Sequence, residues 1–194
     1  MKILIAGVGG QGIVYLSNII VEAAMLSDIS VSVSEIHGLS QRGGVVTSGI
    51  GLRENVSGFV GKASVDWLFG LEPLETIRCL PLLHKQSNVI FGNNKILPYS
   101  VNAQMTTYPD IDNFVNYLEG QIKEVVYINR FPTEIQSVLY NIFLLGRATR
   151  MKKFPLAFQK IKTAIENTVE GYYREKTLDV FNRGIKFIDQ MINT

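Results

Sequence analysis

Two segments near the start of the chain contain the residues whose types and spacing could support chemistry. The first, residues 7–12, reads Gly-Val-Gly-Gly-Gln-Gly. Glycines between a strand and a helix allow a tight turn and let backbone N–H groups approach a phosphate at the N-terminus of the helix. They also allow the strand to pack closely against the helix without any ligand. The spacing therefore predicts a strand, a turn and a helix, and it leaves both roles open.

The second segment, residues 34–44, reads Ser-Glu-Ile-His-Gly-Leu-Ser-Gln-Arg-Gly-Gly. Its candidate contact residues are polar side chains followed by two glycines: Glu35, His37, Ser40, Gln41, Arg42, Gly43 and Gly44. Such a segment predicts contact with a ligand or with another protein surface, whereas a solvated loop is the simpler alternative. The Arg42 guanidinium could bind a carboxylate or phosphate, or form an ion pair across a subunit interface. The His37 imidazole could act as a general base, although a structural hydrogen bond is the simpler role.

Glu35 stands 23 residues after Gly12, close to where a dinucleotide-binding fold places the acid that contacts a ribose. NAD or FAD binding is therefore an alternative. The additional Gly10, followed by Gln11, departs from the usual glycine pattern, and a ribose contact does not explain the other polar residues of segment 34–44. Dinucleotide binding is the less favoured interpretation.

The elements that must position these segments begin with a short apolar run at residues 3–6, which is typical of a buried strand. Residues 13–25 then predict a helix. Val31 and Val33 alternate with serines and predict a second strand that ends at Glu35. The chain therefore opens with a strand–helix–strand unit, for which a right-handed crossover is expected.

Later segments supply further elements. Residues 45–52 and 56–60 flank a three-residue loop, which predicts a hairpin and hence an antiparallel piece of the sheet. Pro73, after Glu72, favours the start of a helix. Further strands are expected at residues 65–71, 88–92 and 124–128, with an irregular stretch before the last of them. Alternation places Trp67 and Phe69 on one face of their strand, as core residues.

From Thr133 onward the apolar spacing becomes helical. Apolar residues recur at three- and four-residue steps: Ile161, Ile165, Val169, Leu178, Phe181, Ile185, Ile188 and Ile192. This pattern predicts about three helices. The chain is therefore expected to form a single domain, residues 1–194, of the α/β class. Its predicted architecture is a three-layer α/β/α arrangement with a mostly parallel, mixed sheet, a Rossmann-like start and a helical C-terminal region.

The composition is that of an ordinary globular protein, with 46% hydrophobic residues, 19% charged residues and a net charge of +2. This balance creates no strong field toward nucleic acid or an anionic membrane, so neither is predicted as a partner. The first residues lack the long apolar region of a signal peptide, and no window reaches the ~18 apolar residues of a membrane span. We therefore expect a cytoplasmic protein.

Reactive side chains outside the two segments form no clear constellation. The single cysteine, Cys79, excludes an internal disulfide, and alone it cannot hold an iron–sulfur cluster, which needs about four thiolates. Cys79 and His84 are expected to be structural, and no metal site is predicted. The densest basic cluster is Arg147, Arg150, Lys152 and Lys153. It is predicted to be a solvated helix end, with binding of an acidic partner or of phosphates as the alternative.

Taken together, residues 7–13 and residues 34–44 resemble the gamma-type subunit or domain of the 2-oxoacid:ferredoxin oxidoreductases. Their motifs are most similar to those of the indolepyruvate oxidoreductase beta subunits. The resemblance continues through residues 70–75, 141–148 and 181–184, and so covers nearly the whole chain. Similar proteins often carry a basic residue at a position that ungapped comparison aligns with Gly51, and Arg53 follows two places later.

The resemblance implies a part in the oxidative decarboxylation of a 2-oxoacid, aryl-pyruvates such as indolepyruvate being the expected substrates. Coenzyme A would accept the acyl group and ferredoxin the electrons. Thiamine diphosphate and iron–sulfur clusters would lie on a large alpha-type partner subunit, so this chain would not turn over substrate alone. The residues that would bind coenzyme A or phosphate, or contact the partner subunit, are Gly7, Gly9, Gly10, Gln11, Gly12, Glu35, His37, Ser40, Gln41, Arg42, Gly43 and Gly44. No catalytic residue is assigned.

Two other functions are compatible with the same residues. An orphan module could bind a nucleotide or coenzyme A through the glycine loop without redox activity. An NAD-dependent enzyme with a Rossmann-like fold would need the glycine loop and Glu35 to bind one cofactor.

Overall fold

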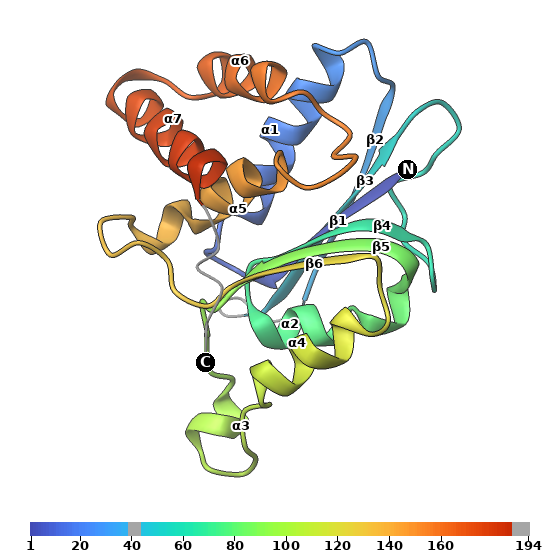
Figure 1. Cartoon of the computed structure of the whole chain (residues 1–194), viewed down its shortest axis with the longest axis vertical. Helices are drawn as coiled ribbons and strands as arrows, with labels where there is room; N and C mark the ends of the chain where they lie inside the picture. Colours follow the sequence, from blue (N-terminus) through green and yellow to red (C-terminus); the bar gives the residue numbers. More distant parts are fainter. Residues whose placement is uncertain (39–43, 188–194) are drawn as a thin grey trace.

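The centre of the molecule is a six-stranded β-sheet, seen in a computed structural model that describes residues 1–38 and 44–187 (Figure 1). Its strand order is β2-β3-β1-β4-β5-β6. The strands are β1 (Lys2–Val8), β2 (Val31–His37), β3 (Val45–Leu52), β4 (Val65–Gly70), β5 (Leu83–Gly92) and β6 (Glu124–Ile128). β3 is antiparallel to both of its neighbours, and the other neighbouring pairs are parallel. The prediction of a mostly parallel, mixed sheet is confirmed.

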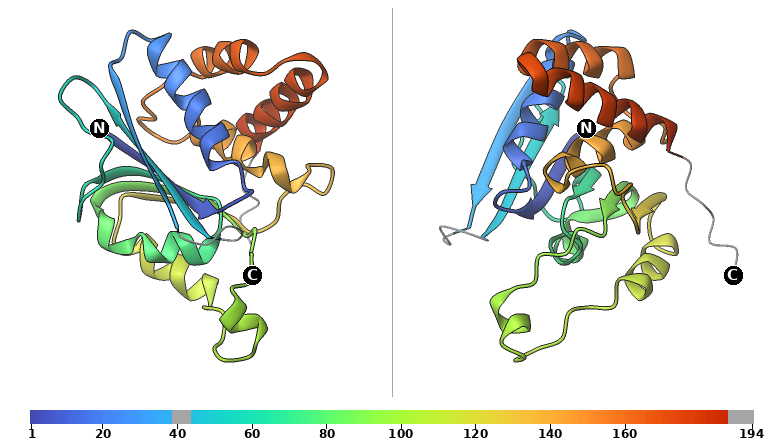
Figure 2. Two further views of the ribbon diagram at one scale, coloured as in Figure 1. Left: turned by 180° about the vertical axis from the view of Figure 1, so that it is seen from behind. Right: turned by 90° about the vertical axis from the view of Figure 1, so that its left-hand side faces the viewer.

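Helices cover both faces of this sheet (Figure 2). In the described part of the chain they are α1 (Ile13–Met25), α2 (Pro73–Arg78), α3 (Tyr99–Asn102), α4 (Ile111–Glu119), α5 (Tyr140–Ala148), α6 (Phe158–Thr168) and α7 (Gly171–Lys186). Two 3-10 turns, η1 (Leu80–Leu82) and η2 (Ser137–Leu139), complete the elements there. Helices α1, α5, α6 and α7 lie on one face and α2 and α4 on the other, as the three-layer prediction requires.

The opening unit forms as the apolar pattern predicts. Because side chains alternate along a strand, Ile3 and Ile5 of β1 enter the core on the α1 side, whereas Leu4 enters the core on the α2 side. Helix α1 begins at Ile13, and β2 continues to His37, two residues beyond the expected end. The strand–helix–strand unit is confirmed, but β3 lies between its two strands.

The two cores differ in size. The larger core joins the sheet to α1, α5 and α6, and it contains Trp67 and Phe69 on one face of β4, as expected. Both rings meet Phe154 edge to face, at centroid distances of 5.0 Å and 6.2 Å. Full burial of such side chains stabilises the fold by roughly 1.5–3 kcal/mol each. The smaller core, beneath α2 and α4, contains Cys79.

The hairpin predicted around residues 53–55 is wrong, because residues 56–60 form no strand. β3 instead forms its hairpin with the preceding β2. The chain then crosses the face of these strands, where the hydroxyl of Ser32 donates to the carbonyl of Val56. A side chain at Gly51 would overlap that carbonyl oxygen, so a basic residue does not fit this position of the sheet.

The middle of the chain holds a helix that the sequence analysis missed. The stretch expected to be irregular includes α4, whose first turn is capped because the Asp110 carboxylate accepts a hydrogen bond from the Asn113 amide at 3.0 Å. Ile111, Phe114 and Leu118 are buried at helical spacing. An acidic cap followed by apolar residues at this spacing was the signal available in the sequence.

The C-terminal region is helical, as predicted. Helices α5 and α6 pack against α1, and α7 packs against α5 and α6. α7 ends at Lys186, and the predicted apolar positions Ile188 and Ile192 lie outside the described residues. Within the described ranges, no helix has both the length and the apolar character needed to cross a bilayer.

Candidate functional site

The glycine loop lies where β1 ends and α1 begins, at the edge of the sheet formed by the carboxyl ends of β1, β4, β5 and β6. Gly9 and Gly10 are exposed, with Gly10 at φ 100°. Gly12 is the N-cap of α1 at φ 74°, a left-handed conformation that favours glycine. The loop thus presents main-chain atoms beside the first turn of a helix, where N–H groups lack partners within the helix.

Gln11 points inward from this loop and is 6% exposed. Its side-chain oxygen accepts a hydrogen bond from the Val8 amide at 2.8 Å. Its nitrogen donates to the carbonyl of Leu71 at 2.9 Å and to that of Asn94 at 3.4 Å. The side chain therefore fills the crevice between the ends of β1 and β4, where open α/β sheets often bind ligands. Contact with an outside molecule is left to the loop's main chain.

Asn141, at the start of α5, braces the same loop and was not predicted as a site residue. Its side-chain nitrogen donates to the carbonyls of Gln11, at 3.3 Å, and Gly12, at 3.1 Å. Its side-chain oxygen accepts from the amide of Ile142 at 2.7 Å. A polar residue at the head of the apolar run Ile-Phe-Leu-Leu was the available signal, because a buried amide needs partners.

The second predicted segment meets the glycine loop through one main-chain hydrogen bond, between Gly9 and Gly44, whereas the Gly38–Val45 hydrogen bond closes the segment itself. The Gly9 amide donates to the Gly44 carbonyl at 3.0 Å, and the Gly38 amide donates to the Val45 carbonyl at 2.7 Å. The two motifs, 22 residues apart in the sequence, therefore form one surface. Four predicted site residues, Ser40, Gln41, Arg42 and Gly43, lie outside the described residues.

Glu35 and His37 lie on β2, at some distance from the loop. The His37 Nε2 atom is 3.3 Å from a carboxylate oxygen of Glu35, and both side chains reach solvent. In the strand register Glu35 pairs with Ser48 of β3, which pairs with Ile5 in the middle of β1. Glu35 is thus two strand spacings, about 10 Å, away from β1 and below the level of the loop. This placement does not suit an acid that shares a dinucleotide with the glycine loop.

An apolar pocket of about 270 Å³ opens beside Gly12. Its walls come from α1, η2, the end of α6 and α7, and they include Tyr15, Leu139, Val169 and Tyr173. The Tyr15 hydroxyl lies 3.3 Å from that of Thr177, and burial raises the pKa of Tyr15. The pocket suits an apolar group whose polar end rests on the glycine loop.

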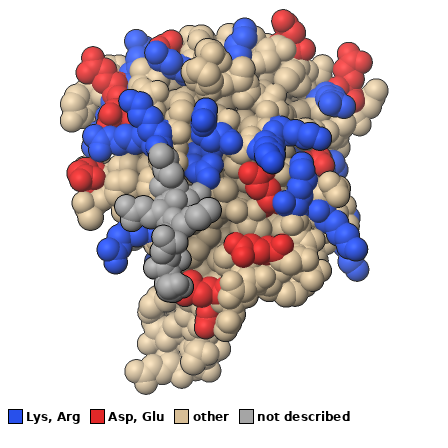
Figure 3. Space-filling model, in the orientation of Figure 1, with Lys and Arg blue, Asp and Glu red and all other residues tan. Residues whose placement is uncertain are grey.

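Basic side chains lie in several places on the face of the molecule that Figure 3 draws. Figure 3 shows Lys and Arg across the helical half of the molecule, whereas the lowest part, around α3, shows neither basic nor acidic groups. Of the predicted basic cluster, Arg147 lies in the last turn of α5, where cations favour the helix dipole.

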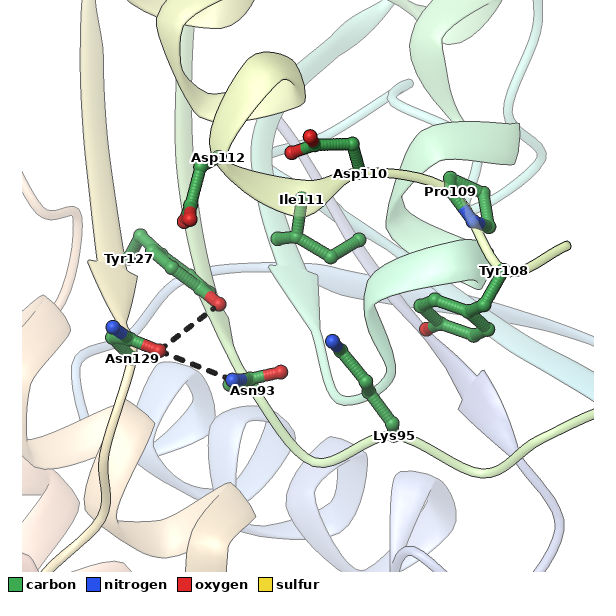
Figure 4. Close-up of a pocket in the computed structure, with 9 residues that line it drawn as sticks. All are labelled: Asn93, Lys95, Tyr108, Pro109, Asp110, Ile111, Asp112, Tyr127 and Asn129. Atoms are coloured by element: carbon green, nitrogen blue, oxygen red, sulfur yellow. Dashed lines mark hydrogen bonds between the residues drawn. The ribbon is translucent and has the colours of Figure 1, made fainter.

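A polar pocket of about 350 Å³ lies at the carboxyl ends of β5 and β6 (Figure 4). Three of its side chains bond to one another: the Asn129 oxygen accepts from Asn93 at 3.1 Å and from the Tyr127 hydroxyl at 3.4 Å. Burial, together with the charge of Asp112, raises the pKa of Tyr127 to about 12. This tyrosine therefore keeps its proton at neutral pH.

Cys79 and His84 occupy structural positions. Burial, followed by the charge of Glu75, raises the pKa of the Cys79 thiol to about 12, whereas a reactive cysteine has a depressed pKa. The His84 Nε2 atom lies 3.5 Å from a carboxylate oxygen of Asp66. An iron–sulfur cluster does not fit the chain's residues, since it needs about four thiolates and this is the sole cysteine. In ranges 1–38 and 44–187, no three His, Cys, Asp or Glu side chains gather as metal ligands.

Comparison with known sequences gives one consistent result. Residues 2–187 match the family described as pyruvate ferredoxin/flavodoxin oxidoreductase. The chain is 33% identical over 186 residues to indolepyruvate oxidoreductase subunit IorB of Methanothermobacter thermautotrophicus, covering 94% of this chain and 95% of that protein. It is 31% identical to the subunit of the same name from Thermococcus kodakarensis, covering 98% and 97%.

Solved structures share the fold. The gamma subunit of a keto/oxoacid ferredoxin oxidoreductase from Geobacter sulfurreducens has a TM-score of 0.66 at 17% identity, covering 95% of this chain and 96% of that one. The 2-oxoglutarate:ferredoxin oxidoreductase of Magnetococcus marinus, solved with 2-oxoglutarate, coenzyme A and succinyl-CoA bound, has a TM-score of 0.64 at 12% identity. There the similarity covers 96% of this chain but 30% of the longer one, so this fold also occurs as part of a larger polypeptide.

Proposed function

The chain belongs to the pyruvate ferredoxin/flavodoxin oxidoreductase family, and from this premise we propose that it is the small, gamma-type subunit of a cytoplasmic 2-oxoacid:ferredoxin oxidoreductase. In the proposed reaction a 2-oxoacid loses its carboxylate as CO₂, and the remaining acyl group forms a thioester with coenzyme A. Two electrons pass to ferredoxin and one proton is released. Thiamine diphosphate, when bound in such a complex, supplies the stabilisation of the carbanion formed by decarboxylation.

The observation that carries this proposal is the joining of the two sequence motifs at the Gly9–Gly44 hydrogen bond. Gln11 and Asn141 hold the loop from inside, so its exposed glycine backbone is fixed before any partner arrives. A rigid and exposed main chain suits contact with a protein surface or with a coenzyme A phosphate. We therefore propose that the surface of residues 7–12 and 34–44 completes the active-site entrance of the complex.

The cofactors are proposed to lie on a large alpha-type partner subunit. The chain's one cysteine does not suffice for a cluster, so its residues are left with binding and positioning roles. The names of the relatives support an aryl-pyruvate substrate such as indolepyruvate. Residues 1–194 are proposed to act as one domain within that complex.

The experiment that tests this function is anaerobic purification of the tagged chain from its native cells, with the co-purifying proteins identified by mass spectrometry. We expect a large subunit that contains thiamine diphosphate and iron. The complex should reduce ferredoxin in the presence of coenzyme A, with higher kcat/KM for indolepyruvate than for pyruvate or 2-oxoglutarate. Recovery of the chain alone from cells that make such a subunit would contradict the proposal and favour an orphan nucleotide- or coenzyme A-binding module.

A pair of substitutions tests whether segment 34–44, rather than the surface in general, contacts coenzyme A or the partner. Arg42→Ala should raise KM for coenzyme A or lower the yield of the complex by about tenfold, as expected for loss of a charge-assisted hydrogen bond. Arg130→Ala, an exposed arginine that precedes η2, is the matched control and should change neither quantity. Equal behaviour of the two variants would remove Arg42 from the site.

A further inference from the structure

A segment after β5 leaves the body of the molecule and carries no charge. Residues 96–107, hereafter the arm, include α3. They project beyond the sheet in the views of Figures 1 and 2. The arm reads Ile-Leu-Pro-Tyr-Ser-Val-Asn-Ala-Gln-Met-Thr-Thr, without Asp, Glu, Lys, Arg or His. The uncharged lowest part of Figure 3 is this region.

The arm exposes large apolar side chains to an unusual degree. None of its 12 residues is buried. Tyr99 is 79% exposed and Met105 is 72% exposed, and Ile96 and Leu97 also reach solvent. Exposed apolar side chains without neighbouring charges are typical of the centre of a protein–protein interface, where Tyr and Met are enriched and charged residues are depleted.

The backbone of the arm is nevertheless ordered by its own hydrogen bonds. The Ala103 amide donates to the Tyr99 carbonyl at 2.8 Å, and the Met105 amide donates to the Ser100 carbonyl at 2.9 Å. The Asn102 side chain donates to the Leu97 carbonyl at 3.2 Å. A surface that is shaped before binding loses less conformational entropy when it binds.

Both ends of the arm are held by one buried carboxylate. Glu72, fully buried at the start of α2, accepts from the Ile96 amide at 3.3 Å and from the Tyr108 hydroxyl through the same oxygen. The residue two places before the arm, Asn94, accepts a hydrogen bond from Gln11 of the glycine loop. The arm is therefore fixed relative to the glycine loop, and the two lie at the same edge of the sheet.

From these observations we infer that the arm inserts into an uncharged, apolar groove on the large partner subunit. This inference rests on the proposed function, because the partner is the subunit that is proposed to meet the glycine loop. Binding to nucleic acid or to an anionic membrane depends on Lys and Arg side chains, and the arm contains neither. Because Asn94, at the base of the arm, bonds to the glycine loop, the two surfaces belong to one interface.

The test compares charge insertion in the arm with charge insertion elsewhere. The arm variant is Tyr99→Glu with Met105→Glu. The control variant is Phe59→Glu with Met25→Glu, two residues that are 63% and 62% exposed near the opposite edge of the sheet. Each tagged chain is purified anaerobically with the large subunit, and the thiamine diphosphate and iron recovered per chain are measured. Tyr99→Ala with Met105→Ala provides a milder second variant.

We expect the arm variant to recover at least about tenfold less large subunit than the wild type, and the control to stay within about twofold of it. Circular dichroism of each isolated chain should show the same thermal midpoint, because the substituted arm side chains are exposed. A fluorophore on Thr106→Cys, at an exposed position of the arm, should shift its emission to shorter wavelength when the large subunit is added, because the buried Cys79 leaves the new cysteine as the accessible thiol.

Distinct outcomes would overturn the inference. Wild-type recovery by the arm variant, with an unchanged fluorophore, would show that the arm lies outside the interface even though the complex forms. Failure of the wild-type chain itself to recover a subunit with thiamine diphosphate and iron would overturn the proposed function first. Dimers of the isolated chain, or binding to phosphatidylcholine vesicles, that the arm variant abolishes would assign the arm to a second copy or to a membrane.

Discussion

The glycine loop and the arm both follow parallel strands at the same edge of the sheet, yet they are built in opposite ways. The loop is short, and buried amide side chains hold it from two sides, Gln11 from within and Asn141 from α5. The arm is long, none of its residues is buried, and it is attached at its two ends through Glu72. The loop contributes to the stability of the fold, whereas the arm depends on the fold for its position.

The loop and the arm therefore serve two different roles at one edge of the sheet: the loop stabilises the fold, and the arm is available for contact with a partner. Side chains that satisfy buried main-chain groups in the loop cannot be changed without a cost in folding free energy. Side chains that point from the arm into solvent can be changed almost freely unless a partner covers them. Stability measurements on the isolated chain and assembly measurements on the complex should therefore respond to different residues.

The largest effect is expected for Gln11→Ala, which leaves the Val8 amide and the Leu71 carbonyl without their partners. Each of the two buried groups left unsatisfied costs about 1–3 kcal/mol, so the free energy of unfolding should fall by about 2–6 kcal/mol. Urea denaturation of the isolated chain measures this change. Gln121→Ala, at an exposed glutamine, is the control and should stay within about 0.5 kcal/mol of the wild type. Equal effects of the two variants would show that the loop is not held by Gln11.

A second pair of substitutions compares two glycines of the same loop. A Cβ at Gly12 would overlap the side-chain nitrogen of Asn141, whereas a Cβ at Gly10 meets open space. Both glycines have positive φ, so Gly10→Ala should cost about 1–2 kcal/mol from backbone strain alone. Gly12→Ala should cost more, by about 1 kcal/mol or above.

A double-mutant cycle isolates the overlap at Gly12. When Asn141→Ala is already present, Gly12→Ala should cost no more than Gly10→Ala, because the overlapping side chain is gone. Additive effects of Gly12→Ala and Asn141→Ala in urea denaturation would contradict a direct contact between the two residues.

A smaller effect is expected where the arm joins the body. Tyr108→Phe removes the hydroxyl that donates to Glu72 and accepts from the Leu74 amide, so unfolding should require about 1–2 kcal/mol less at neutral pH. Burial, and then the hydrogen bond to Glu72, raise the pKa of Tyr108 above its usual 10.0. Above pH 10 the unfolded chain therefore loses this proton before the folded chain does, and the stabilisation declines as pH rises. The gap between wild type and Tyr108→Phe should close over that range, and a gap independent of pH would contradict this assignment.

The smallest effect is expected in the arm itself. Tyr99→Ala and Met105→Ala should each change the free energy of unfolding of the isolated chain by less than about 0.5 kcal/mol, since both side chains face solvent. Met151→Ala, at a methionine that is 4% exposed, is the matched core substitution and should cost about 2–5 kcal/mol. A loss in the arm variants as large as that of Met151→Ala would show that the arm is part of the folded core.

Patterns of neighbouring residues predicted the elements whose formation depends on those neighbours alone. The start of α1 after Gly12 and the Glu72–Pro73 start of α2 follow from glycine conformation, proline geometry and capping. The course of residues 56–60 was not predictable in this way, because a β-prone run forms a strand only where a neighbour offers free pairing groups. Here β1 and β2 already pair with both edges of β3.

The sequence was enough to predict which segments form the site, but not which side chains contact one another within it. The glycine loop and segment 34–44 were identified from residue types, but the inward direction of Gln11 and the bracing role of Asn141 depend on long-range packing. The distance of Glu35 from the loop depends on the insertion of β3, which a strand–helix–strand pattern does not reveal. The uncharged arm was visible in the sequence, but its projection was not.

The burial of the lone thiol has a practical consequence for work with the isolated chain. Cys79 is enclosed beneath α2 and stays protonated well above neutral pH, so air offers it little thiolate to oxidise. Oxidation of this thiol therefore sets no need for anaerobic handling of the isolated chain.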